Sequence, residues 1–219
     1  EDDKSKWRKE LKYRLGGVGE KIEEKVFEKT GKYIFDRGSA FTYDFSWANL
    51  QFCKLDYIQF VNSNLMHANM KNSSLLNAWL IGCNLQSVDL SYSNMQRLNV
   101  VNSSFQNTNL SHSNLHASNL SSVNLSYANL SHVNFDSADL RGVDFSFAIL
   151  EKTNLHYAKL SGANLSKADF TNGFFVKKDI RGVVFSKTIF HIKHKEALVK
   201  IGVNLSYCIL VDNKGNTIK

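Results

Sequence analysis

The sequence predicts a mainly β fold: a solenoid whose coil turns a corner every five residues and is closed at its ends by short helices. Every fifth residue from Phe45 to Phe190 is Phe, Leu, Met, Val or Ile, thirty positions in succession. Two residues before most of these stands a small residue, and the residue just before is often Asn or Asp. Neither the 3.6-residue period of a helix nor the two-residue period of a strand produces this pattern.

Each position of the five-residue unit has a physical role, seen most cleanly in SHSNL, SSVNL and SYANL. The large and the small residue point inward and fill a narrow bore, while the Asn or Asp holds the corner through local hydrogen bonds. The other two residues face solvent. Four corners close a square coil of about 20 residues, and coils stack at about 4.8 Å. Ile58 and Leu98 are large for the small position, so we expect their coils to bulge.

These units resemble the pentapeptide-repeat proteins, whose consensus is A(D/N)LXX. The resemblance covers residues 41–190, with a further half coil at Val203–Leu210. It implies a right-handed quadrilateral β-helix. The absence of proline agrees with a fold in which nearly every backbone N–H joins a ladder.

The two ends of the chain lack the repeat. Residues 1–40 carry apolar side chains four apart, as in Trp7, Leu11 and Leu15, and predict an α-helical N-terminal cap. Residues 41–190 form the β-helix. Residues 191–219 are expected to hold a short basic helix at 191–201, the last half coil and a hairpin turn at Asn213–Gly215.

Composition favours a protein without a membrane span, since no apolar run approaches the ~20 residues that one needs. The three cysteines, Cys53, Cys83 and Cys208, are expected to be reduced and buried. The start of the sequence has no signal-peptide pattern. These features predict a cytoplasmic protein; the alternative, secretion by a bacterium into a host cell, is what the family resemblance implies. The net charge of +7 is concentrated after residue 175, which leaves the repeat tract nearly neutral.

Exposed aromatic residues among Ser and Asn are the main candidates for function, because recognition surfaces use such residues. The alternative is that the rings stack on one another and support only the rod. The residues we expect to bind a partner are Trp47, Phe52, Tyr92, Tyr127, Phe147 and Tyr157.

Three other clusters have simpler explanations. His116, Asp136 and His156 form one outward column, but the histidines would lie about 10 Å apart, too far to share one metal ion. His112 and His132 form a second column, either a strip for a partner or plain surface. Val61, Ile81 and Val101 form an apolar patch, for a partner, a dimer or a terminal helix. The lysines after residue 175 are expected to be solvated, with contact to nucleic acid or acidic lipid as the alternative.

No nucleophile elbow, phosphate-binding loop, HExxH motif or carboxylate pair is present in the sequence. We therefore predict no enzyme, and no catalytic, cofactor-binding or metal-binding residue or small-molecule substrate. The prediction is a protein–protein interaction module. The resemblance extends to bacterial effectors of the HECT-like ubiquitin ligase type, whose catalytic part would lie outside this chain. One alternative is a DNA mimic that binds topoisomerase, and another is a structural spacer or homodimer. The charge pattern disfavours the DNA mimic, and it also disfavours binding of nucleic acid by this chain.

Overall fold

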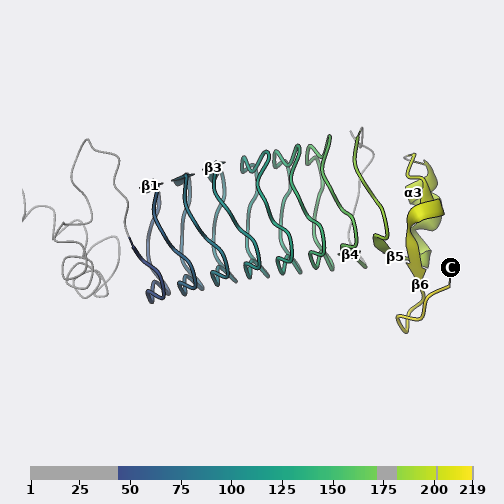
Figure 1. Cartoon of the computed structure of the whole chain (residues 1–219), viewed down its shortest axis with the longest axis horizontal. Coiled ribbons are helices and arrows are strands. Elements are labelled where there is room, and N and C mark those ends of the chain that lie inside the picture. Colours follow the sequence, from purple (N-terminus) through teal and green to yellow (C-terminus); the bar gives the residue numbers. More distant parts are fainter. Residues whose placement is uncertain (1–43, 172–181, 201, 219) are drawn as a thin grey trace, which may run out of the picture.

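The computed structural model describes residues 44–171, 182–200 and 202–218. The helical cap that we predict for residues 1–40 lies outside these ranges. Figure 1 shows the described coils stacked along the long axis of the molecule, with the C-terminal elements at one end.

The stacking register is 20 residues, as the five-residue period predicts. Strand β1 (Gln59–Val61) pairs in parallel with β2 (Trp79–Ile81), which pairs in parallel with β3 (Asn99–Val101). Single parallel bridges join residues 20 apart on the other sides of the rod, as between Asn114 and Asn134. Backbone hydrogen bonds connect each coil to the next, as the Leu125 N–H donates to the Asp144 carbonyl at 2.8 Å.

The bore is filled by the two inward registers. Among the large residues, Phe105, Phe135 and Phe145 are completely buried, and Ala128 and Ala138 fill small positions. Small polar residues in this register are also buried, and apart from Ser113 their hydroxyls are bonded. Thr153 Oγ1 donates to the Leu130 carbonyl at 3.0 Å. The side-chain size pattern therefore determines the interior, and a buried hydroxyl is tolerated because the coil below supplies an acceptor.

Each corner is a tight turn whose last central residue has a positive φ. In one such corner the N–H of Ala128 donates to the Leu125 carbonyl at 3.2 Å, and Tyr127 between them has φ 61°. The Asn or Asp side chain braces the corner, as predicted: Asn134 Oδ1 accepts from the Asp136 N–H at 3.1 Å. This pairing spans the large inward residue and satisfies an N–H that the turn would leave free.

The column that holds Ile58 and Leu98 differs from the others. Both residues are buried, with Ala78 between them. On this side of the rod the backbone stays extended for three residues per coil and forms β1, β2 and β3, where most other positions form single bridges.

The C-terminal end holds a second parallel sheet, in the order β4 (Asp169–Phe170), β5 (Ile189–His191) and β6 (Ile209–Val211). Between β5 and β6 lie a 3-10 turn, η2 (Ile192–His194), the helix α3 (Lys195–Lys200) and a further 3-10 turn, η3 (Leu205–Tyr207). The helix predicted at 191–201 is therefore present but shorter. The predicted turn is also present, since Val211 and Thr217 form an antiparallel bridge across it.

Candidate functional site

The candidate site is one long side of the rod, together with the two corners that border it. Because one coil takes 20 residues, corner residues 20 apart stack into columns. We call one the first corner column: Trp47, His67, Ser87, Asn107, Tyr127, Phe147, Lys167, Lys187 and Tyr207. The second corner column is Phe52, Asn72, Tyr92, His112, His132 and Lys152.

The side between these columns is polar. Its outward positions are mostly Asn and Ser, and we call it the Asn/Ser face. Most of its side chains are half-buried and locally bonded: Asn109 Nδ2 donates to Asp89 Oδ1 at 3.2 Å, and Ser111 Oγ donates to Asn109 Oδ1 at 2.8 Å. The face is thus a regular polar surface between two rows of larger, more exposed side chains.

Most of the predicted partner-binding residues lie on these two columns. Trp47, Tyr127 and Phe147 belong to the first, and their side chains are well exposed, Trp47 to 73 %. Phe52 and Tyr92 belong to the second. The prediction that these residues point outward is confirmed, whereas binding by them remains a prediction.

Tyr157 is not part of this grouping. It lies on the next corner, in the column of Tyr57, and its ring packs edge-on against His156 with centroids 3.7 Å apart. It is half exposed and has a positive φ like the others, so its position makes it a natural control for them.

The rings stack along the rod axis. The centroids of Tyr127 and Phe147 lie 4.6 Å apart with the planes 8° from parallel. In the second corner column, the ring centroid of His112 lies 4.7 Å from that of Tyr92 and 4.5 Å from that of His132, and the ring planes are again nearly parallel. Where rings stack in this way, the faces between them cover each other and their edges are directed to solvent. Stacking within the rod, which the sequence left as an alternative to binding, is therefore present, and it leaves the edges free for a partner.

The backbone beneath the rings is in the left-handed region. The φ angles are 64° at Trp47, 58° at Phe52, 59° at Tyr92, 61° at Tyr127 and 60° at Phe147. For an L-residue this conformation costs about 1–2 kcal/mol, which Gly avoids. Gly is present at equivalent corners elsewhere in the chain, as at Gly142 and Gly162.

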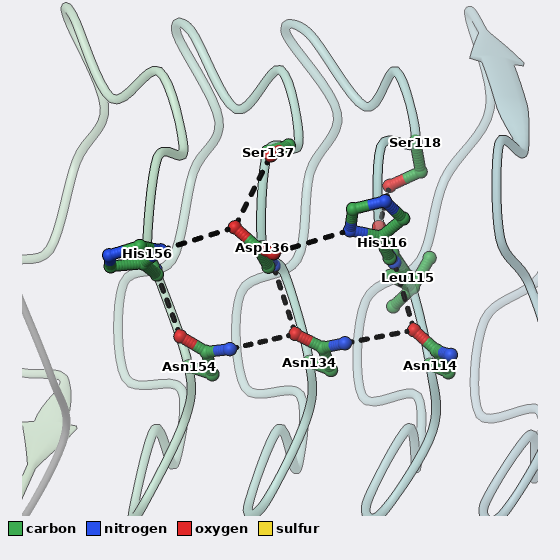
Figure 2. Close-up of polar contacts among 9 residues, drawn as sticks. All are labelled: Asn114, Leu115, His116, Ser118, Asn134, Asp136, Ser137, Asn154 and His156. Atoms are coloured by element: carbon green, nitrogen blue, oxygen red, sulfur yellow. Dashed lines mark hydrogen bonds and ion pairs between the residues drawn. The ribbon is translucent and has the colours of Figure 1, made fainter.

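The predicted His–Asp–His column forms as Figure 2 shows, with Asp136 between the two histidines. Its Oδ2 lies 3.5 Å from His116 Nδ1 and its Oδ1 lies 3.6 Å from His156 Nδ1. Below them runs a ladder in which Asn154 Nδ2 donates to Asn134 Oδ1 at 2.9 Å and Asn134 Nδ2 donates to Asn114 Oδ1 at 3.1 Å. Within the described ranges, no three His, Cys, Asp or Glu side chains are arranged to hold a metal ion.

Two exposed features were missed by the sequence reasoning. Trp79 is 42 % exposed beside the predicted patch of Val61, Ile81 and Val101, and Ile149 is 45 % exposed on the Asn/Ser face. Both occupy the position before the large inward residue, where Asn or Asp is usual. The substitution of an apolar residue for Asn or Asp at that position is the signal that could have found them.

All three cysteines are buried and none forms a disulfide, as predicted. Burial raises the pKa of the Cys53 thiol to about 11, and it also raises the pKa values of Cys83 and Cys208. Thiols held in the protonated form are poor nucleophiles, so these residues are structural.

Comparison with protein families identifies the repeat. A model described as a pentapeptide repeat region matches residues 96–165, and one described as pentapeptide repeats (8 copies) matches residues 44–78, 74–107 and 148–186. The chain belongs to the pentapeptide-repeat family. Together the matches span most of the chain and agree with the coil register described above. A search of curated proteins finds no match.

Several solved structures of this family are similar to the chain. QnrB1, a plasmid-mediated fluoroquinolone resistance protein, was solved after trypsin treatment of a variant; it is 21 % identical over 78 % of each chain, with a TM-score of 0.42. Rfr23 from the cyanobacterium Cyanothece 51142 is 33 % identical over 40 % of this chain and 63 % of its own, with a TM-score of 0.28. HetL from Nostoc sp. strain PCC 7120, involved in heterocyst differentiation regulation, is 19 % identical over 67 % of this chain and 84 % of its own, with a TM-score of 0.23. At these TM-scores the comparison gives no information on function.

Among the described residues, no helix has the length and apolarity to cross a bilayer. Of the basic residues after position 175, Lys177, Lys178 and Arg181 lie outside the described ranges. Lys187, Lys193, Lys195 and Lys200 are exposed, as the sequence predicts.

Proposed function

We propose that this pentapeptide-repeat protein is a protein–protein interaction module without enzymatic activity, and that its binding surface is the Asn/Ser face with the two corner columns. The observation that carries this proposal is the presence of large aromatic residues at strained, exposed corners. Trp47 and Phe52 are exposed by 73 % and 71 %, so they gain little from burial while their backbone is left-handed. Gly would avoid this strain, and the large rings that bear it gather on the two columns that border one face, which supports a functional role for that face.

The surface suits a protein partner. Exposed Tyr and Trp edges offer apolar area and hydrogen-bonding groups at a small cost in side-chain entropy, and Asn and Ser between them add adaptable polar contacts. The imidazole nitrogens of His112 and His132 add further polar groups at the edge of the stack. A regular polar face bordered by aromatic residues resembles the composition of recognition surfaces generally.

The proposed setting is a bacterial effector that recognises a host protein. The Asn- and Ser-rich repeat tract supports this through its resemblance to effectors of the HECT-like ubiquitin ligase type. In that setting the module would select the substrate, and the catalytic cysteine would belong to a region outside this chain. The buried, protonated cysteines of the chain itself are unsuited to that chemistry.

A DNA mimic directed at topoisomerase is disfavoured, because a mimic must reproduce the phosphate charge of a duplex. Lys71, Lys152, Lys167 and Lys187 lie on or beside the corner columns, where a mimic would carry carboxylates. A gyrase supercoiling assay decides between the two, since a mimic would inhibit or protect the enzyme. The remaining alternative is a spacer or homodimer, and light scattering would detect a homodimer as an assembly of two copies of the chain.

The experiment uses the full chain as bait in a host-cell lysate. Trp47→Asn and Tyr127→Asn remove the rings but keep a residue that tolerates the left-handed backbone. Tyr57→Asn is the matched control, because Tyr57 is 65 % exposed with φ 60° on a different corner. We expect the first two variants to lose the partner and the control to keep it. Equal capture by all variants would refute the proposed surface.

A further inference from the structure

The first corner column changes character near its C-terminal end. After Tyr127 and Phe147 it continues as Lys167, Lys187 and Tyr207. The coils are in register there: the Lys167 N–H donates to the Ser186 carbonyl at 2.8 Å and the Lys187 N–H donates to the Tyr207 carbonyl at 2.6 Å. The two lysines therefore occupy equivalent corners of adjacent coils, about 4.8 Å apart along the rod. We call Lys167 and Lys187 the lysine pair.

The positive charge of the lysine pair has no carboxylate partner among the described residues. Lys167 Nζ lies over the Phe147 ring, 4.5 Å from its centroid, and neither ammonium forms an ion pair there. Two like charges on adjacent coils repel each other, and a counter-charge from outside would relieve this.

The two nearest carboxylates of the Asn/Ser face are already engaged. Asp169 Oδ1 accepts from the Thr171 N–H at 3.0 Å and from its hydroxyl. Glu151 Oε1 lies 3.3 Å from Lys152 Nζ, on the opposite corner. Neither carboxylate therefore forms an ion pair with Lys167 or Lys187.

An apolar spot lies beside the lysine pair. Ile149 is 45 % exposed on the Asn/Ser face and Phe147 is 41 % exposed on the adjoining corner. Ile149 occupies a position that is Asn or Asp in the coils below it, from Asn49 to Asn129. A ligand for this region would thus present negative groups to the lysines and one apolar side chain to Ile149 and Phe147.

We infer that the partner docks here through an acidic segment of its own chain, in which carboxylates flank an apolar residue. This inference rests on the proposed function and specifies the chemistry of the partner. Charge complementarity is its basis, since opposite charges at the rim of an interface orient the partner and speed association. Nucleic acid is less suitable, because a phosphate backbone offers no apolar side chain to the exposed Ile149 and Phe147.

The test measures binding of a fluorescein-labelled peptide of alternating Glu and Leu by fluorescence anisotropy. The full chain is compared with the double variant Lys167→Gln/Lys187→Gln. The matched control is Lys54→Gln/Lys159→Gln, which removes the same charge from exposed lysines on other sides of the rod. We expect the first variant to bind about four- to twenty-fivefold more weakly, at roughly two- to fivefold per exposed charge pair. The control is expected to bind like the unmodified chain.

Salt and competing ligands complete the design. Binding is expected to weaken from 50 to 500 mM salt, as exposed charge pairs do, and a Gln–Leu peptide is expected not to bind. The inference is wrong if both double variants lose affinity equally, if the acidic peptide does not bind, or if duplex DNA or phosphatidylserine vesicles bind more tightly through the same lysines.

The lysate capture separates this inference from the proposed function. If capture depends on Trp47 and Tyr127 but is unaffected in the Lys167/Lys187 variant, the proposed surface stands and the acidic segment is excluded. If the ring variants and the lysine variant all capture the partner normally, the surface itself is wrong.

Discussion

The left-handed corner at Tyr127 provides a direct test of how this rod balances strain against stacking. Tyr127→Ala removes the stacked contact with Phe147, which is worth about 0.5–1.5 kcal/mol beyond area burial, and keeps a side chain on a backbone with φ 61°. Tyr127→Gly removes the same contact but also relieves about 1–2 kcal/mol of strain. Against this relief stands the larger backbone entropy of unfolded Gly, about 0.5–1 kcal/mol.

We therefore expect the Gly variant to be more stable than the Ala variant by about 0.5–1 kcal/mol, from the difference of those two effects. Ser131, four residues further on, is the control: it is half-buried and its φ is not positive. At Ser131 the order should reverse, with Gly less stable than Ala by about 0.5–1 kcal/mol.

The measurement is urea unfolding followed by far-UV circular dichroism, with midpoints compared at equal slopes. The sign reversal between the two sites is the diagnostic result, because it does not depend on how much stability each ring contributes. If Gly is less stable than Ala at both positions, the corner at Tyr127 is unstrained, and the argument that its ring is retained for function loses its basis.

Three further predictions follow from the described contacts. Ellman's reagent at pH 8 should label no cysteine in the folded chain and all three in urea, because burial raises the thiol pKa values. Asn134→Ala should cost about 1–3 kcal/mol in urea unfolding, as it removes the acceptor of the Asp136 N–H and breaks the ladder; Asn119→Ala, at an exposed corner brace, should cost less. Burial lowers the pKa of His194, helped by Lys193 and His191, so the unfolded state binds a proton more tightly. The C-terminal elements should then lose hydrogen-exchange protection as pH falls below about 6.5, and His194→Gln should abolish that loss.

The periodicity of the sequence was sufficient to predict the coil, because side-chain size alone decides which residues fit the bore. Phe135 and Ala138 illustrate this, since each is completely buried at the position its size predicts. The braces were equally predictable, because an Asn side chain reaches the N–H two residues later. These are local relations within one unit.

The proposed binding surface could be predicted only in part. Six of the exposed rings were identified from the sequence. The separation of Tyr157 from the other five requires the corner geometry as well as the period. Ile149 and Trp79 were missed because they stand at the position that Asn or Asp normally fills as the corner brace. An apolar residue there is recognised as unusual only once the role of that position is known. The helix α3 is shorter than predicted because the His191 side chain caps a 3-10 turn first, with its Nδ1 accepting the Lys193 N–H at 3.1 Å.

The same construction explains how such a rod can carry a binding surface without losing its fold. Stability comes from the filled bore and from backbone ladders that every coil repeats, so a corner residue contributes to stability mainly through its strain and its stacking on the neighbouring coil. Corners can therefore hold Gly, Asn, Lys or Trp on nearly the same backbone, as φ values from 53° at Lys152 to 66° at Gly142 demonstrate. A column of corner residues is then a linear array that can vary with the partner while the coil stays constant. The change from rings to lysines along the first corner column is such a variation, which is why its two ends are expected to contact chemically different parts of one partner.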